Sequence, residues 1–171
     1  LAINKVGIKS LKHPLRIGSR NGEAQSTVAV CNMYVDLAHD CKGTHMSRFI
    51  EILNAQDSAL DMEGFKTLLA DMQHRLEAQR GYVELTFPYF IRKRAPVSGV
   101  ESYLDYEVTL FGEINEGVPA ITIKVVIQVT SLYPCSKKIS AYGAHNQRSH
   151  VTVSARPCGP LWIEDLIELV E

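Results

Sequence analysis

The feature that most constrains the fold is a long strand pattern that leads into a polar segment. Isoleucine or valine occupies every second position of residues 121–129, and mostly polar residues stand between them. Strict alternation over this length predicts a strand with one buried face. A shorter pattern of the same kind covers residues 150–154. The two strands would hold the polar segment 130–150 between them, and loops held by rigid strands are where functional sites usually lie.

The rest of the chain predicts an α+β domain. Residues 1–26 read as short extended pieces, and alternating apolar residues predict further strands at 27–37, 82–87, 104–113 and 120–130. Helical spacing of apolar residues predicts helices at 46–53, 61–80 and from residue 162 onwards. Antiparallel strands with helices collected on one face make an α+β domain. The length of 171 residues suits a single domain, residues 1–171.

Local signals predict where several elements begin and end. Thr44 is a candidate cap for the first helix, and Asp61 is the plausible N-cap of the second. Gly81 is expected to stop the second helix at its C-terminal side. Asn115-Glu116-Gly117 predicts a hairpin connection between two strands.

Charge and composition exclude several classes of protein. The net charge of −1 creates no global field that would attract nucleic acid or an anionic membrane. No apolar run approaches the ~20 residues of a membrane span. The four cysteines lack the spacing of a disulfide framework, so reduced thiols are expected. We therefore expect a cytoplasmic protein that binds neither nucleic acid nor membrane.

The polar segment holds a thiol and an imidazole, Cys135 and His145. A thiolate and an imidazole can share a borderline-soft metal such as zinc. Their separation of ten residues is not the spacing of a zinc finger. A structural loop with a buried thiol is the alternative, since most free cysteines behave as small apolar residues.

Three sequence motifs, in order along the chain, resemble those of one enzyme family. The segment TSLYPCSKKISAYGAHNQRSHV (130–151) is similar to the signature of type IB GTP cyclohydrolases, in which a Cys-Pro-Cys-Ser turn precedes Gly-Ala-His-Asn-Gln-Arg. KGTHMSRF (42–49) is similar to a second motif of that family. APVSG (95–99), followed by Leu104-Asp105-Tyr106, is similar to a third. The resemblance runs from about Ile3 to the last residue.

The resemblance implies a fold, an assembly and a reaction. It implies a tunnelling fold, whose subunits join their sheets into an oligomeric barrel with active sites at subunit interfaces; a homotetramer is expected. The reaction is the metal-dependent hydrolysis of GTP to 7,8-dihydroneopterin triphosphate and formate, the first step of folate biosynthesis. The cofactor would be a divalent metal, zinc or manganese.

The resemblance also assigns roles to particular residues. His145 would bind the metal, with Cys135 as a partner. Cys135, His150 and His45 are the candidate catalytic residues. Cations and donors suited to a triphosphate are Lys42, Ser47, Arg48, Arg92, Lys93 and Arg148. A structural role in the strand for His150 and a capping or packing role for His45 stay open.

The chain departs from the family pattern at Tyr133. In the family the first cysteine of the Cys-Pro-Cys turn is the metal ligand, and Tyr133 takes its place here. A phenol with a pKa near 10 is a poor zinc ligand compared with a thiolate. Tyr133 could remove activity, Cys135 could replace the missing ligand, or the site could use oxygen-rich coordination that prefers manganese.

Two further expectations concern the end of the chain and the rival functions. Glu171 comes only ten residues into the last helix, and the family's acidic ligand and purine-anchoring glutamate are expected beyond it. Within these residues the site would therefore be incomplete. The alternatives are an inactive relative that binds GTP or a pterin, and another tunnelling-fold enzyme such as a nitrile reductase of queuosine synthesis.

Overall fold

The structure, a computed structural model, describes residues 3–37, 45–56, 58–95, 97–133 and 145–171. It describes the side chains of the same residues except 3, 4, 37, 131–133, 145 and 146.

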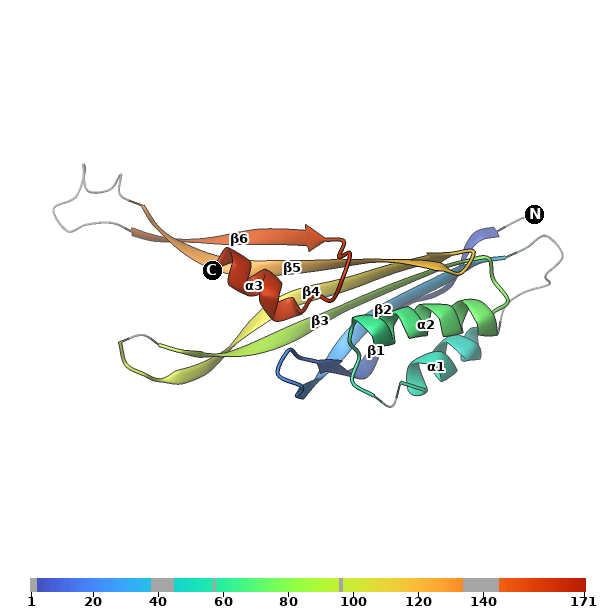
Figure 1. The fold of residues 1–171 in the computed structure, drawn as a ribbon, viewed down its shortest axis with the longest axis horizontal. Helices are drawn as coiled ribbons and strands as arrows, with labels where there is room; N and C mark the ends of the chain where they lie inside the picture. The colour runs from blue at the N-terminus through green and yellow to red at the C-terminus, as the bar shows by residue number, and fades with distance from the viewer. Residues whose placement is uncertain (1–2, 38–44, 57, 96, 134–144) are drawn as a thin grey trace.

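The described chain forms one six-stranded antiparallel sheet in which neighbours in the sheet are neighbours in the sequence (Figure 1). Its strands are β1 (Ile3–Gly18), β2 (Ala24–Leu37), β3 (Arg80–Arg94), β4 (Glu101–Asn115), β5 (Val118–Tyr133) and β6 (His145–Ala155). Every adjacent pair is antiparallel, from β1 with β2 to β5 with β6. The predicted α+β class is therefore confirmed.

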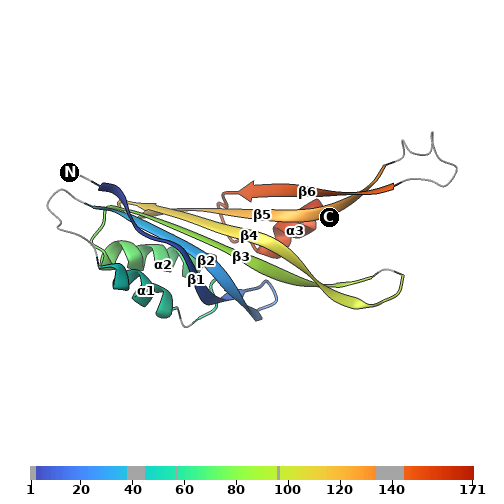
Figure 2. The same cartoon turned by 180° about the vertical axis from the view of Figure 1, so that it is seen from behind.

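Three helices cover one face of this sheet (Figures 1 and 2). They are α1 (Met46–Asn54), α2 (Met62–Arg75) and α3 (Ile163–Val170). The helix α1 lies over β1, α2 lies over β3, β4 and β5, and α3 lies over β5. None of the helices in the described part of the chain is long and apolar enough to cross a membrane.

The core forms between the helices and the inward face of each strand. Of the predicted inward face of β5, residues Ile121, Ile123, Val125 and Ile127 are buried, and Val129 is partly buried. On α2 the predicted apolar stripe is also buried, with Phe65, Leu68, Leu69 and Met72 fully covered. Each such side chain stabilises the fold by about 1.5–3 kcal/mol relative to leaving it in water.

The turn between β4 and β5 confirms the predicted hairpin. Asn115 pairs directly with Val118, so the loop consists of Glu116 and Gly117. Both have positive φ, 48° and 81°. Two such residues form the turn whose twist matches that of the flanking strands. Gly117 supplies that conformation without strain.

The helix caps were predicted with mixed success. Asp61 is the N-cap of α2, as expected, and its carboxylate accepts a hydrogen bond of 2.8 Å from the Gly64 N–H. The N-cap of α1 is His45, not Thr44.

The prediction that Gly81 stops α2 was wrong. The helix ends at Arg75, and Gly81 lies in β3, paired with Val35 and Ile114. A Cβ at Gly81 would lie 2.5 Å from Met72 Cε, so close packing against α2, rather than a helix cap, explains the glycine.

The strands at both ends of the chain are longer than predicted. β1 is one strand with a register shift between Ile8 and Leu11, where Ser10 has φ of 57° and its N–H donates to Asn32 Oδ1. β5 continues to Tyr133 and β6 begins at His145, so both extend into the segment 130–150 that was expected to be a loop; residues 134–144 lie outside the described residues. Pairing with a neighbouring strand overrides the polar composition of these segments, because strand preference depends on context.

Hydrogen bonds and ion pairs attach α3 to the sheet. Arg20, in the turn between β1 and β2, bonds to Asp165 at 3.0 Å and to Glu168 at 2.5 Å. Tyr89 Oη donates to Glu164 Oε1 at 2.6 Å. Burial and the neighbouring Glu164 carboxylate raise the pKa of Tyr89, so the phenol keeps its proton and acts as the donor. We call Arg20, Tyr89, Glu164, Asp165 and Glu168 the α3 contact cluster.

Gly112 of β4 offers a test of the packing between α2 and the sheet. A Cβ at this position would lie 2.6 Å from Leu69 Cδ1 and 2.9 Å from Phe65 Cε1. We expect Gly112→Ala to lower the free energy of unfolding by about 1–3 kcal/mol, because overpacking forces the core to shift. Urea denaturation measures this loss. Gly159→Ala is the matched control: no atom lies within 4 Å of its Cβ position, so its effect should stay within ~0.5 kcal/mol. Equal effects of the two variants would contradict this packing.

The ion pair between Arg20 and Glu168 predicts a pH-dependent contribution to stability. Hydrogen bonds from Arg20 hold the pKa of Glu168 below its ordinary value. The contribution is therefore present above the ordinary glutamate pKa of about 4.3 and is lost as the pH falls through the lowered pKa. We expect Glu168→Gln to shift the urea midpoint downward at pH 7 and to have no effect once the carboxyl is protonated. Leu169→Ala, an exposed residue of the same helix, should have the same small effect at every pH. A Glu168→Gln effect that does not change with pH would refute this account.

Candidate functional site

The hairpin of β5 and β6 brings two residues of the signature into register. Tyr133, the last residue of β5, pairs with His145, the first residue of β6. Directly opposite residues of an antiparallel pair have Cβ atoms about 4.5–5.5 Å apart. The position of the family's ligand cysteine therefore lies across the ladder from the predicted metal-binding histidine. Cys135 lies outside the described residues, and the side chain of His145 is not described.

His150 and Arg148 lie further along β6, on the face of the sheet opposite the helices. They pair with the exposed Gln128 and Thr130, whereas the alternate residues of β5, the buried Ile127 and the partly buried Val129, face the helices. The side chains of His150 and Arg148 are both exposed. The structure therefore places a titratable imidazole and a guanidinium on one open strand surface.

A second group of predicted residues lies at the start of α1. His45 and Ser47 are exposed, and Arg48 donates one hydrogen bond of 2.9 Å to the Arg75 carbonyl. Neither an acidic residue in the first turn nor a side-chain cap at His45 occupies this helix end in the described chain. Free N–H groups at a helix N-terminus suit an anion. Lys42 lies outside the described residues.

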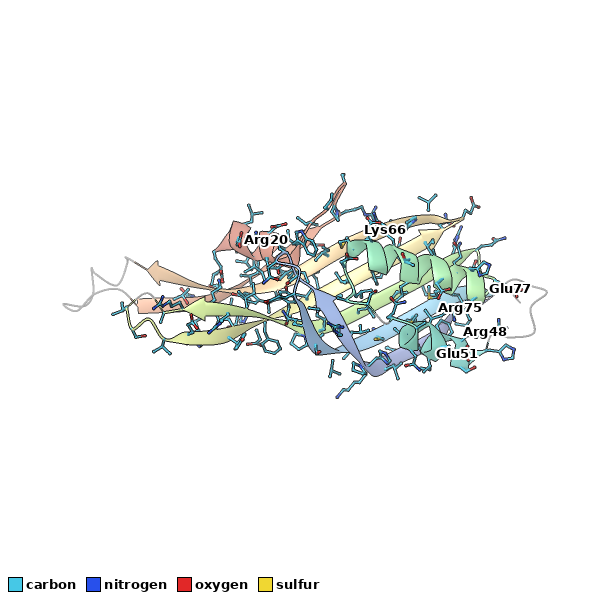
Figure 3. All side chains as sticks on the ribbon, turned by 60° about the horizontal axis from the view of Figure 1, so that its bottom comes forward. Arg20, Arg48, Glu51, Lys66, Arg75 and Glu77 are labelled. Carbon is cyan, nitrogen blue, oxygen red and sulfur yellow. The ribbon has the colours of Figure 1, made fainter. Side chains whose placement is uncertain are left out.

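The two groups lie at opposite ends of the sheet. Arg48 is bonded to Arg75 near the beginning of β3, and Figure 3 shows both residues with Glu77 at one end of the molecule. The beginning of β5 lies at this same end, because Val118 pairs with Asn115 and Asn115 pairs with Arg80. From there β5 runs for 16 residues to Tyr133, which is a span of roughly 50 Å. Within one protomer the two groups therefore cannot contact one nucleotide.

The cations predicted to bind phosphate immediately before the third motif form ion pairs within the chain. Arg92 forms an ion pair with Glu101, and Lys93 forms one with Glu171. Arg94 Nε donates to the Gly99 carbonyl at 3.1 Å. Phosphate would have to compete with these partners for Arg92 and Lys93, whose phosphate role stays a prediction.

The described residues do not by themselves form a metal centre. They contain no group of three or more histidine, cysteine or acidic side chains close enough to hold a metal ion. Catalytic zinc usually takes three protein ligands, and His145 and Cys135 would supply two. The buried Cys31 is unsuited to ligation, because desolvation raises the pKa of its thiol to about 11. A metal here would need ligands in addition to the predicted pair.

Sequence analysis did not anticipate a groove beside the α3 contact cluster. The groove has a volume of about 940 Å³ and is lined by the turn between β1 and β2, by β3 and by α3. Glu164 Oε2 is buried there without a hydrogen-bond partner among the described residues. Arg20 and Glu168 are 148 positions apart, so no local spacing signals their contact. The acidic face of the last helix was visible in the sequence, but its partner was not.

Comparison with known proteins gives a consistent result. The profile of the family described as "Type I GTP cyclohydrolase folE2" matches residues 1–171. A protein of Azoarcus sp. (strain BH72) named "GTP cyclohydrolase FolE2" is 63% identical over 172 residues, which cover all of this chain and 64% of the relative. Proteins with the same name from Thiobacillus denitrificans and Nitrosococcus oceani are 61% and 59% identical, again over all of this chain and 64% of each relative.

The chain thus spans a little under two thirds of the length of these relatives. Its family is nevertheless shown by a profile match that extends from the first residue to the last. All three sequence motifs, at residues 42–49, 95–99 and 130–151, fall within that match. The chain therefore belongs to the type I GTP cyclohydrolase FolE2 family.

Proposed function

We propose that the full-length protein containing this chain is a GTP cyclohydrolase of the first step of folate biosynthesis, acting in the cytoplasm. It hydrolyses the imidazole ring of guanine in GTP and yields formate and 7,8-dihydroneopterin triphosphate. The observation that carries the proposal is the family profile match over the whole chain. Relatives with 54–63% identity that bear this enzyme's name support it.

The β5–β6 hairpin is the proposed reaction centre. His145 and Cys135 are the proposed holders of a divalent ion, zinc or manganese. When bound, such an ion supplies the Lewis acidity that brings the pKa of water near neutrality. The exposed imidazole of His150 is the proposed carrier of protons to and from the ring nitrogens of guanine, because histidine is the side chain that most often acts as a general acid and base. His45 is a second candidate for this proton transfer.

The proposed triphosphate site combines a helix N-terminus with nearby cations. The start of α1 has no side-chain cap within the described residues, and Lys42, Ser47 and Arg48 lie in the same segment of the sequence. Within the described residues, Arg48 uses one of its five donors, in the bond to the Arg75 carbonyl. Arg148 is exposed on β6, and Arg92 and Lys93 would have to exchange their carboxylate partners for phosphate.

The separation of the two groups favours an assembly in which neighbouring copies share each site. A site that uses both the α1 start and the β5–β6 hairpin must take them from different protomers, because one protomer holds them at opposite ends. The end strands β1 and β6 have neighbours on only one side within the described sheet. Both edges can therefore pair with other copies, as the tunnelling-fold barrel of a homotetramer requires.

The reaction can be tested directly with the full-length protein. We expect incubation with GTP and Mn²⁺ or Zn²⁺ to release formate and a fluorescent pterin. His145→Ala should abolish both products, because the predicted metal ligand is lost. Val118→Ala, an exposed residue at the opposite end of β5, is the control that should leave turnover unchanged.

The result also separates the rival functions. GTP binding without formate release would overturn the proposal in favour of an inactive binding relative, the reading that Tyr133 favours. Reduction of a nitrile with NADPH would point instead to the queuosine-pathway enzyme.

Replacing Tyr133 tests the role of this position in metal binding. Outer contacts of a metal site alone change metal affinity by 10–100-fold. We therefore expect Tyr133→Cys, which restores a direct thiolate ligand opposite His145, to raise zinc affinity by at least about tenfold and to raise turnover. Tyr133→Ser is the matched control, because it removes the phenol without adding a thiol. Equal zinc affinities of these two variants, measured by competition with a chelating dye, would disprove a ligand role at this position.

A further inference from the structure

The end of the β5–β6 hairpin projects beyond the elements that surround the rest of it. β4 pairs with β5 only as far as Val126. β5 and β6 remain paired without a register shift up to Tyr133 and His145. Figure 1 shows this end of the hairpin lying past α3, and Gln147 and Ser149 are exposed there. Within the described chain, both faces of this two-stranded end are therefore open to a ligand.

The row of residues on the helix side of β6 changes character along the strand. Side chains of a strand alternate between the two faces of a sheet. This row begins with Ala155 and Val153, which pack against the core. It becomes polar after Val151, toward the end of the hairpin that lies past α3. From the core outward, the strand positions of the row are Ala155, Val153, Val151, Ser149, Gln147 and His145.

Gln147 is the residue of this row that follows the predicted metal ligand. Positions 145 and 147 of β6 share one face and lie roughly 7 Å apart along the strand. Arg148 and His150 belong to the opposite, open face of the same strand. A site on the helix side meets such open-face residues only when they come from another copy, which agrees with the proposed sharing of sites.

The chemistry of guanine suits a carboxamide at this position. The proposed reaction opens the imidazole ring of guanine, so that ring must lie beside the ion held at position 145. The edge of guanine next to the reacting carbon presents two acceptors, O6 and N7. A carboxylate cannot donate to these atoms, whereas the side-chain amide of Gln147 carries two donor hydrogens and no charge.

We propose that Gln147 recognises the substrate by donating a hydrogen bond from its side-chain amide to guanine O6. This inference rests on the proposed function and adds a residue to its site. The hydrogen bond would hold the purine against the helix side of the hairpin and keep its imidazole half at position 145. Ring opening leaves O6 unchanged, so the bond can persist from GTP to the product.

Binding of two purine triphosphate analogues to the full-length protein tests the proposal. In 7-deaza-GTP and 7-deaza-ATP a carbon replaces N7, so hydrolysis cannot open the ring of either analogue. At position 6 the first carries an acceptor oxygen and the second carries a donor amino group. Isothermal titration calorimetry gives the two dissociation constants, and their ratio is the measured quantity.

We expect Gln147→Glu to reduce the preference for 7-deaza-GTP over 7-deaza-ATP by at least about tenfold, because a carboxylate accepts from the amino group but repels the carbonyl oxygen. Gln147→Leu should reduce it by about fivefold, through loss of the hydrogen bond alone. Both analogues carry the same triphosphate, so repulsion between the new carboxylate and the phosphates cancels in the ratio. A purely structural role for Gln147 would weaken the binding of both analogues equally and leave the ratio unchanged.

Gln128→Glu is the matched control, because it makes the same substitution at an exposed glutamine on the open face of β5. This variant should keep the wild-type ratio. A wild-type ratio in both Gln147 variants, or a wild-type protein that binds neither analogue, would overturn the inference even where GTP is hydrolysed. A shifted ratio without formate release would uphold recognition by Gln147 and reject the proposed reaction instead.

Discussion

Burial of a single face of the sheet is the constraint on which the rest of the structure depends. All six strands present alternate residues to α1, α2 and α3, and the opposite face carries mostly polar or half-exposed residues. A shift of one residue in any strand would exchange the buried and exposed sets, so the core fixes the register of every pair. The register in turn sets Tyr133 opposite His145 and orders His150 and Arg148 along β6. The geometry of the candidate site is thus a consequence of packing on the other side of the sheet.

The length of the strands has an equally direct consequence for function. Because β5 is 16 residues long, groups attached to its two ends are roughly 50 Å apart. The α1 segment and the signature hairpin both resemble motifs of the GTP cyclohydrolase family, yet a single protomer cannot apply both to one substrate. The proposed sharing of each site between copies would resolve this conflict, and the edges of β1 and β6, unpaired in the described sheet, are compatible with it. The architecture therefore links the proposed chemistry to the proposed assembly.

Some basic side chains form ion pairs within the chain, whereas others are exposed and are candidates for substrate binding. Arg20 holds α3 against the turn between β1 and β2 through two carboxylates, so its charge serves the fold. Arg92 and Lys93 are also paired, whereas His150 and Arg148 are exposed on an edge strand. A single exposed ion pair contributes little to the stability of a protein. Here, however, several hydrogen bonds and ion pairs act together on the short helix α3. Their combined effect is to position α3, whose buried side chains complete the core over β5.

The sequence by itself determined the element types, because alternation and helical spacing record which side of each element faces the core. It also determined the family, the hairpin at Glu116-Gly117 and the Asp61 cap, since these depend on residues close together in the chain. Only the tertiary structure decided the end of α2, the full length of β5 and β6, the partners of Arg20 and Arg92, and the wide separation of the two site groups. Each of these depends on contacts between residues distant in sequence, and no local pattern encodes a packing distance such as that between Gly81 and Met72.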